Sequence, residues 1–330
     1  MRVGVALGAG GAVGVAFHGG VLAALQEATG WDPRDAEVLV GTSAGSLSAS
    51  LLRLGLTTAD LRAVSEGQPL SDVGQLVAGP GGPHRPRTDL RAFLRPRPPA
   101  SVAAAARGLL DPRGRLPLAL AAALLPPGPV PTTAMSAGID RVAGGEWPDR
   151  ELWLCSVRLR DGRGVVFGRA GDPRAPLGLA VAASCAVPAY YEPVRIDGER
   201  FVDGGVSSLH HAGLLHPRQL DLVVVSAPMA HTATPGGARA AGPLRRYARR
   251  QLDRELVALR RAGVPVLVLA PTRRVVTAMG TDPLDARRRA MVSRLAHRAT
   301  LDYLERPAAR ELLAGLTGQA PARPAGSPAA

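Results

Sequence analysis

Short apolar runs, each followed at once by a glycine-rich turn, dominate the start of the chain. Residues 2–7 (RVGVAL) lead into residues 8–14 (GAGGAVG), and residues 37–40 (EVLV) lead into Gly41–Gly45. Runs of this length with β-branched residues are typical of strands that are buried on both faces. A helical segment follows each turn. Alternating strands and helices predict a parallel sheet, with the active loops at the carboxyl ends of its strands.

The same alternation continues along the chain. Strands are predicted at 151–158, 164–167, 193–196, 200–202, 221–226 and 265–270, and helices at 15–28, 46–54, 177–184, 244–262 and 282–306. The Asp197–Gly198 turn indicates a hairpin between two of the strands. Together these elements predict an α/β fold, a three-layer sandwich around a mostly parallel central sheet.

One domain over residues 1–314 is the expected organisation, because 330 residues with 46% hydrophobic content can form one large core. Proline and glycine crowd both ends of residues 79–134, which are predicted to be a Pro/Ala-rich helical insertion. This insertion is interpreted either as a lid or as a surface excursion without a role. Residues 315–330 are rich in Gly, Pro and Ala and are predicted to be disordered.

The formal net charge is +13, and the chain contains no lysine, so every positively charged side chain other than histidine is arginine. Composition is biased towards Ala, Arg, Gly and Pro throughout, so the charge alone does not indicate a nucleic-acid partner, and none is expected. The arginine-rich helices predicted at 285–298 and 244–262 are expected either to contact an anionic membrane or to present solvated faces, with Asp253 and Glu255 as the partners on helix 244–262. Its clustered arginines are Arg245, Arg246, Arg249, Arg250 and Arg254.

Cys155 and Cys185 stand in apolar surroundings without a CxxC motif, which predicts two small buried residues. Neither a metal nor another cofactor is expected. Residues 1–25 are mostly apolar, but glycines and His18 interrupt them, so no signal peptide is expected. No apolar stretch is long enough to predict a transmembrane helix. These observations favour a cytoplasmic protein, with peripheral membrane contact as the alternative.

Ser43 lies in Gly41-Thr42-Ser43-Ala44-Gly45, directly after a predicted strand. Glycines two residues before and two residues after a serine permit a sharp strand-to-helix turn that exposes the hydroxyl. The helix N-terminus at this turn favours developing negative charge. The GxSxG pattern is weak alone in a chain rich in Gly, Ala and Ser, but its position between a strand and a helix favours a nucleophile.

The glycine-rich segment 8–14 can bind an oxyanion, a phosphate or a pyrophosphate through its backbone N–H groups. A P-loop requires Gly-Lys-Ser/Thr, which is absent. A dinucleotide-binding loop requires Gly or Ala at position 13 and an acidic residue at the end of the second strand, but the chain has Val13 and Val40-Gly41. The pattern therefore favours an oxyanion over a nucleotide.

Asp203-Gly204-Gly205 follows the predicted strand 200–202. An aspartate at the end of a strand and before two glycines can project into a cleft with little steric cover. By itself, the tripeptide more often marks a simple β-turn.

In their order along the chain, these three segments resemble the patatin-like phospholipase family, as do Gly19–Leu22 and residues 183–188 (ASCAVP). The resemblance covers roughly residues 3–60 and 150–226. The chain departs from the family's Gly-Gly-Gly-x-Arg/Lys-Gly loop at Ala9 and at Val13, where the family has a glycine and a basic residue. The second departure is expected to alter the anchoring of the loop or the preference for a lipid head group.

The resemblance implies a lipid acyl hydrolase that acts through an acyl-enzyme on a lipid or another acyl ester. Ser43 would be the nucleophile and Asp203 its base. The implied supporting residues are the oxyanion-hole donors Gly10, Gly11 and Ala12, the elbow residues Gly41 and Gly45, and the motif residues Gly14, Gly204 and Gly205.

Two alternatives stay open at this point. An esterase of the α/β-hydrolase type would need a histidine after the aspartate, and the chain offers His210, His211, His216, His231 and His297. The N-terminal glycine loop and the early position of Ser43 argue against this alternative. A non-catalytic lipid-binding protein on the same fold is the other, and the retention of Ser43 and Asp203 argues against it.

Overall fold

The computed structural model describes residues 1–72, 74–75, 98, 100, 122, 124–216, 218–232 and 242–316. Most of the helical insertion predicted at 79–134, and the predicted tail from residue 317 onwards, lie outside these residues.

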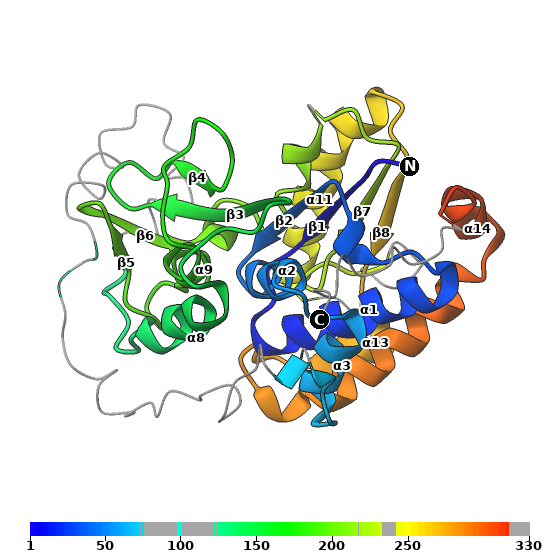
Figure 1. The fold of residues 1–330 in the computed structure, drawn as a ribbon, viewed down its shortest axis with the longest axis horizontal. Coiled ribbons are helices and arrows are strands. Elements are labelled where there is room, and N and C mark those ends of the chain that lie inside the picture. The colour runs from blue at the N-terminus through cyan, green and yellow to red at the C-terminus, as the bar shows by residue number, and fades with distance from the viewer. Residues whose placement is uncertain are drawn as a thin grey trace, which may run out of the picture.

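A mixed sheet forms the centre of the molecule (Figure 1). Its eight strands among the described residues are β1 (Val3–Leu7), β2 (Val38–Thr42), β3 (Glu151–Arg158), β4 (Gly164–Phe167), β5 (Val194–Ile196), β6 (Glu199–Asp203), β7 (Leu222–Ser226) and β8 (Val266–Leu269). The order is β5–β6–β3–β2–β1–β7–β8, with β4 paired to β3. The pairs β3–β2, β2–β1, β1–β7 and β7–β8 are parallel, whereas β4, β5 and β6 pair antiparallel. The prediction of a mostly parallel central sheet is confirmed.

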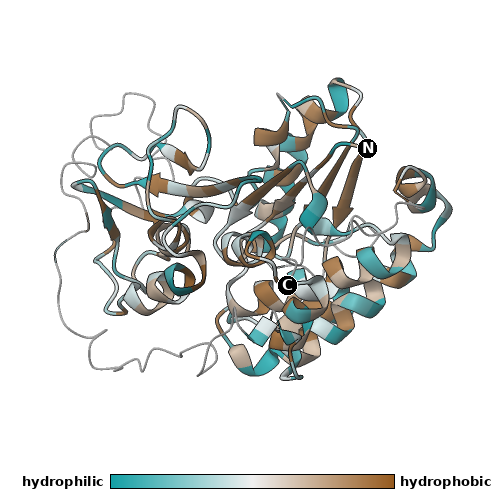
Figure 2. Ribbon diagram, in the orientation of Figure 1, coloured by the Kyte–Doolittle hydropathy of each residue, from teal (hydrophilic) through white to brown (hydrophobic). Residues whose placement is uncertain are grey.

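Helices cover both faces of this sheet, which makes the three predicted layers (Figure 1). Alternate residues of a strand point to opposite faces. Accordingly, Val5 packs in the core with Phe17 of α1 (Gly11–Thr29), whereas Ala6 packs in the core with Leu252 of α11 (Pro243–Arg261). The central strands β1, β2 and β7 are buried along their whole length. Figure 2 colours most of their length as hydrophobic.

The remaining helices complete the two outer layers. They are α2 (Ala44–Arg53), α3 (Thr58–Glu66), α8 (Thr133–Ala143), α9 (Leu177–Ser184), α12 (Arg273–Met279), α13 (Arg289–Leu304) and α14 (Pro307–Leu313), with short 3-10 helices at Pro33–Asp35, Gly204–Val206, Ala212–Leu215 and Ala286–Arg288. Helices α3 and α13 pack beside α1, and α8 packs on α9. Across the described ranges, none of these helices is long and apolar enough to span a bilayer.

Two predicted helices begin four or more residues from the expected position. The helix predicted to begin at residue 15 begins at Gly11, so the glycine-rich loop is shorter than the pattern suggested. The helix predicted to begin at residue 282 begins at Arg289. Here the Asp282 and Asp285 side chains accept hydrogen bonds from the backbone N–H groups two residues later, at 2.9 and 3.1 Å, which favours turns over helix.

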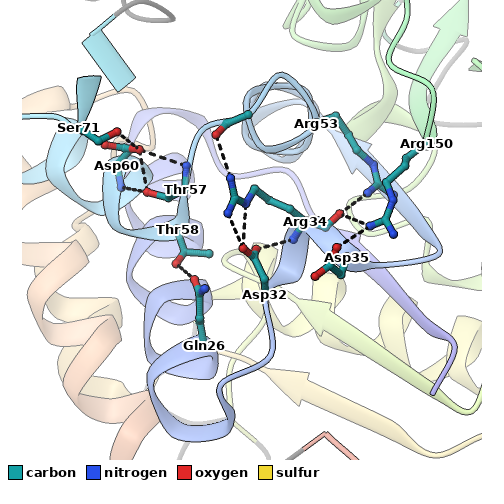
Figure 3. Close-up of polar contacts among 11 residues, drawn as sticks. Gln26, Asp32, Arg34, Asp35, Arg53, Thr57, Thr58, Asp60, Ser71 and Arg150 are labelled. Carbon is teal, nitrogen blue, oxygen red and sulfur yellow. Dashed lines mark hydrogen bonds and ion pairs between the residues drawn. The ribbon is translucent and has the colours of Figure 1, made fainter. Parts of the chain in front are cut away.

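A network of polar contacts ties together the loops at the amino ends of the strands (Figure 3). Arg34 pairs with Asp32 at 2.6 Å, and its backbone carbonyl accepts hydrogen bonds from Arg53 at 2.6 Å and from Arg150 at 2.8 Å. Arg150 also contacts Asp35 at 3.0 Å. This network stabilises the edge of the sheet opposite the glycine-rich turns, which follow the carboxyl ends of β1 and β2.

Candidate active site

Ser43 occupies a sharp turn between β2 and α2, and this turn, residues 41–45, is called the elbow below. Its φ and ψ are 55° and −118°, a left-handed φ that is rare for a residue other than glycine. Strained backbone of this kind is concentrated at functional sites. A Cβ atom at Gly45 would lie 1.8 Å from the Leu7 carbonyl oxygen, and one at Gly41 would lie 2.5 Å from Ser46 Cα. Both positions therefore require glycine.

Asp203 lies at the end of β6, next to the elbow. Strand register explains this placement: Thr42 pairs with Cys155, and Asp203 pairs with the adjacent Ser156 on the other side of β3. The side chain is buried, and Oδ1 accepts a hydrogen bond from the Gly205 backbone N–H at 2.7 Å. The Ser43 side chain lies close enough to this carboxyl to lower its pKa. The fold thus brings together two residues that are 160 positions apart in the chain.

Burial changes the acid–base behaviour of Asp203. Desolvation raises the pKa of this carboxyl from 3.8 to about 6, although the hydrogen bonds from Ser43 and Gly205 act in the opposite direction. A carboxylate with a pKa near 6 is a stronger base than an exposed aspartate, and it is still mostly ionised at neutral pH. The site can therefore accept a proton from a hydroxyl group.

The backbone N–H groups of Gly10, Gly11 and Ala12 lie at the start of α1. Gly8 and Ala9 before them donate to the carbonyls of Ser226 at 2.9 Å and Leu209 at 2.7 Å. Within the described part of the chain, the next three N–H groups have no hydrogen-bond partner. The first turn of any helix leaves such donors unpaired, and the helix dipole favours an anion beside them. These residues can bind an oxyanion.

Two prolines that the sequence pattern did not point to hold this turn in place. A Cβ atom at Gly10 would lie 2.8 Å from Pro228 Cγ, and one at Gly11, where φ is 60°, would lie 2.5 Å from the Pro283 carbonyl oxygen. The same Pro283 oxygen accepts a hydrogen bond from the Val13 N–H at 3.2 Å. The Val13 side chain is buried in the core, so packing anchors the turn where the family pattern has a basic residue.

The three predicted segments converge. An added Cβ atom at Gly14 would lie 3.1 Å from Ala44 Cβ, which places the first turn of α1 against the elbow. Another at Gly205 would lie 3.4 Å from Ala9 Cβ, which places the residues after Asp203 against the glycine-rich segment. Gly204 lies against the β3 backbone, where a Cβ atom would be 2.3 Å from the Cys155 carbonyl oxygen.

His18 supports this arrangement from inside the core, a role the sequence analysis missed. Its Nε2 lies 2.8 Å from the Gly8 carbonyl oxygen and its Nδ1 lies 2.8 Å from Ser226 Oγ. Burial lowers the pKa of His18 to about 4, so the ring is neutral at physiological pH. A carbonyl can only accept, so Nε2 donates to Gly8 and Nδ1 accepts from the Ser226 hydroxyl. The only sequence signal was a histidine in an apolar helix.

The five histidines of the triad alternative make other contacts. In the described residues, none of them forms a hydrogen bond with Ser43 or Asp203. His211 contacts the hydroxyls of Thr42 at 2.9 Å and Ser207 at 3.1 Å, and His297 contacts Glu27 at 2.9 Å. His210 is buried without a partner in that part of the chain. The described residues also contain no cluster of three or more His, Cys, Asp or Glu side chains that could hold a metal ion.

Comparisons with known proteins point to one family. The family model described as "Patatin-like phospholipase" matches residues 5–212. Among solved structures, the chain is similar to VipD from Legionella pneumophila, with 17% sequence identity and a TM-score of 0.44, over 95% of this chain and 67% of that one. A comparison with curated proteins found no match.

Proposed function

This chain belongs to the patatin-like phospholipase family, whose model matches more than half of its length, and from that membership we propose that it hydrolyses acyl esters of lipids with a Ser43–Asp203 dyad. The observation that carries the proposal is the proximity of the two residues: a strained, glycine-flanked serine near a buried carboxyl whose pKa is raised to about 6. Neither a histidine nor a metal ion takes part in the proposed reaction.

In the proposed mechanism, Ser43 Oγ attacks the ester carbonyl carbon while its proton passes to the Asp203 carboxylate. The carbonyl oxygen becomes an oxyanion, and the N–H groups of Gly10, Gly11 and Ala12 donate to it. As the C–O bond to the alcohol breaks, Asp203 returns its proton to the departing alcohol oxygen. A water molecule then attacks the acyl-enzyme, with Asp203 again as base, and releases the free acid and Ser43.

Hydrogen-bond geometry supports this assignment of donors. The N–H of Ser43 already donates to Ser184 Oγ at 3.1 Å, so it is not free for an oxyanion, whereas the three N–H groups of the α1 turn have no partner among the residues that the structure describes. Loss of a single oxyanion donor costs about 10²–10³ in rate in well-studied serine hydrolases. Burial of both dyad residues keeps competing water away from the reacting groups.

A fluorophosphonate probe tests the proposal directly. We expect one covalent adduct on wild-type protein, mapped by mass spectrometry to Ser43, and none on Ser43→Ala. The matched control is Ser48→Ala, which removes another fully buried serine hydroxyl from α2 and should be labelled like wild type. Comparing lipid products of wild type and Ser43→Ala would then identify the ester cleaved. Absence of labelling, while a control hydrolase reacts, would favour the non-catalytic lipid-binding alternative.

The five clustered arginines of helix α11 differ in their exposure. Two of its clustered arginines are half-buried and bind within the protein: Arg245 donates to the Pro228 carbonyl at 2.6 Å, and Arg249 pairs with Asp253 at 3.0 Å. The other three clustered arginines, Arg246, Arg250 and Arg254, are exposed. Arg245 instead holds the loop whose Pro228 packs against Gly10.

The exposed residues near the start of α11 nevertheless fit a membrane surface. Helix α11 precedes the parallel strand β8, so its first turns lie at the carboxyl edge of the sheet, on the side of Ser43. Leu244 and Tyr247 there are 55% and 44% exposed, and Arg250 and Arg254, about one and two turns further along the helix, are also exposed. We propose that this end of α11 contacts anionic lipid, with apolar side chains entering the interface and arginines binding phosphates.

Vesicle sedimentation tests this contact. Arg250→Gln/Arg254→Gln should weaken binding to anionic vesicles by about tenfold or more, since each arginine contributes about 1 kcal/mol near such a surface. Binding of wild type should fall as salt is added. The charge-matched control is Arg298→Gln/Arg310→Gln, which removes two exposed arginines from α13 and α14. Equal binding by the two double variants would reject the assignment to α11.

A further inference from the structure

The hydroxyl of Ser184, the last residue of α9, is fully buried directly behind the elbow. Its Oγ accepts a hydrogen bond from the Ser43 backbone N–H at 3.1 Å and donates to the Cys155 carbonyl oxygen at 2.5 Å. Ser46 Oγ lies 2.6 Å away. A serine hydroxyl has one proton to donate and two lone pairs. Because the proton goes to Cys155, Ser46 must be the donor to Ser184, and every hydrogen-bonding position of Ser184 is then filled.

The next two residues continue these contacts. Cys185 Sγ donates to the Ser43 carbonyl oxygen at 3.2 Å, and the Ala186 carbonyl oxygen accepts from the Asp203 backbone N–H at 2.9 Å. Residues 184–186 therefore bind the backbone of both Ser43 and Asp203. Strand pairing alone does not provide this link, because β6 pairs with β3 and not with β2.

We propose that Ser184 is a positioning residue, whose hydroxyl holds Ser43 in the conformation in which it reacts; this inference rests on the proposed dyad. The backbone of Ser43 has a left-handed φ of 55°, which persists only where the surroundings enforce it. Its carbonyl has further donors in the N–H groups of Ser46 at 2.8 Å and Leu47 at 3.2 Å, but Ser184 Oγ is the one acceptor for its N–H among the described residues.

A serine that merely fills the core would behave differently. Ser48 and Ser50 of α2 are also fully buried, yet their hydroxyls have no partner in the part of the chain that the structure describes. Burial by itself thus does not require the three contacts that Ser184 makes. Without the Ser184 hydroxyl, the Ser43 N–H would be buried without an acceptor, and the elbow would relax and displace Ser43 Oγ from Asp203 and from the α1 turn.

The test measures the reaction of Ser43 with a fluorophosphonate and the hydrolysis of a soluble p-nitrophenyl ester. For Ser184→Ala we expect the labelling rate and kcat to fall by about 10–10²-fold, as small displacements of a reacting group do, with KM within about twofold of wild type. Ser184→Thr, which restores a hydroxyl, should recover most of the labelling rate. Ser48→Ala is the matched control and should react like wild type.

Thermal melting accompanies each measurement. If Ser184→Ala does not fold, Ser184→Cys replaces it: a thiol fills the site but is a weak acceptor for the Ser43 N–H, so the labelling rate should still fall. A folded Ser184→Ala or Ser184→Cys protein that is labelled at the wild-type rate would overturn the inference, as would a folded Ser184→Thr protein as slow as Ser184→Ala. If the wild type itself is not labelled at Ser43, the result contradicts the proposed function and not the role of Ser184.

Discussion

Asp203→Asn is expected to lower kcat/KM for ester hydrolysis by about 10⁴-fold or more, comparable to the loss of an essential acid–base group in other serine hydrolases. An amide cannot accept the Ser43 proton, whereas its carbonyl oxygen can still accept the hydrogen bond from the Gly205 N–H. The geometry should therefore survive while the chemistry does not. Steady-state kinetics on a soluble ester measure the effect. Near-wild-type activity in this variant would rule out the dyad and return attention to the histidines.

The same substitution should stabilise the folded protein at neutral pH. Burial raises the pKa of Asp203 from 3.8 to about 6, so the folded state binds this proton more tightly than the unfolded state does. The cost of the buried charge is absent below pH 3.8, grows between pH 3.8 and 6, and is complete above pH 6, where it amounts to about 3 kcal/mol. Asparagine carries no charge and removes that cost.

Urea unfolding at two pH values separates this contribution from those of other carboxylates. The free energy of unfolding of Asp203→Asn minus that of wild type should be larger at pH 8 than at pH 4.5. A smaller difference at pH 8 would mean that the carboxylate is stabilised in the fold. In the wild type, kcat/KM should also fall about tenfold per pH unit below pH 6, because only the ionised carboxylate acts as a base.

Gly45→Ala is expected to destabilise the protein by roughly 3 kcal/mol or more and to remove most of the labelling of Ser43. The added Cβ atom would lie 1.8 Å from the Leu7 carbonyl oxygen, which is backbone at the end of β1 and cannot rotate away. Helix α2 would have to move off β1 and carry the elbow with it. Urea unfolding measures the stability, and fluorophosphonate labelling reports on Ser43.

Gly138→Ala provides the control for this substitution. Gly138 lies inside α8, and an added Cβ atom would meet no other atom within 4 Å. Alanine there should stabilise the protein by about 0.5–1 kcal/mol, since it reduces the entropy cost of forming the helix, and labelling should be unchanged. We therefore expect Gly45→Ala to lower the free energy of unfolding and Gly138→Ala to raise it. A harmless Gly45→Ala would mean that the elbow is not as tight as the contact with Leu7 indicates.

Local sequence patterns predicted most of the elements correctly. The apolar runs at 37–40 and 221–226 became β2 and β7, and the Asp197–Gly198 turn joins β5 to β6. Errors fell at the ends of helices, where side-chain hydrogen bonds such as that of Asp285 compete with the helical pattern. The spacing of the α11 arginines also left their individual exposure open, because spacing along a helix cannot show that Arg245 reaches inward to the Pro228 loop.

What the sequence determined by itself was the conformation of each short segment. Backbone sterics act within a few residues, so Gly41 and Gly45 predict the Ser43 turn without knowledge of the rest of the fold. Only the tertiary structure placed Asp203 near Ser43, raised the pKa of Asp203 to about 6 by burial, and brought Ser184 and His18 into contact with the backbone of Ser43 and Gly8. Pairing, desolvation and buried hydrogen bonds depend on segments far apart in the chain, and no local pattern records which of them will come into contact.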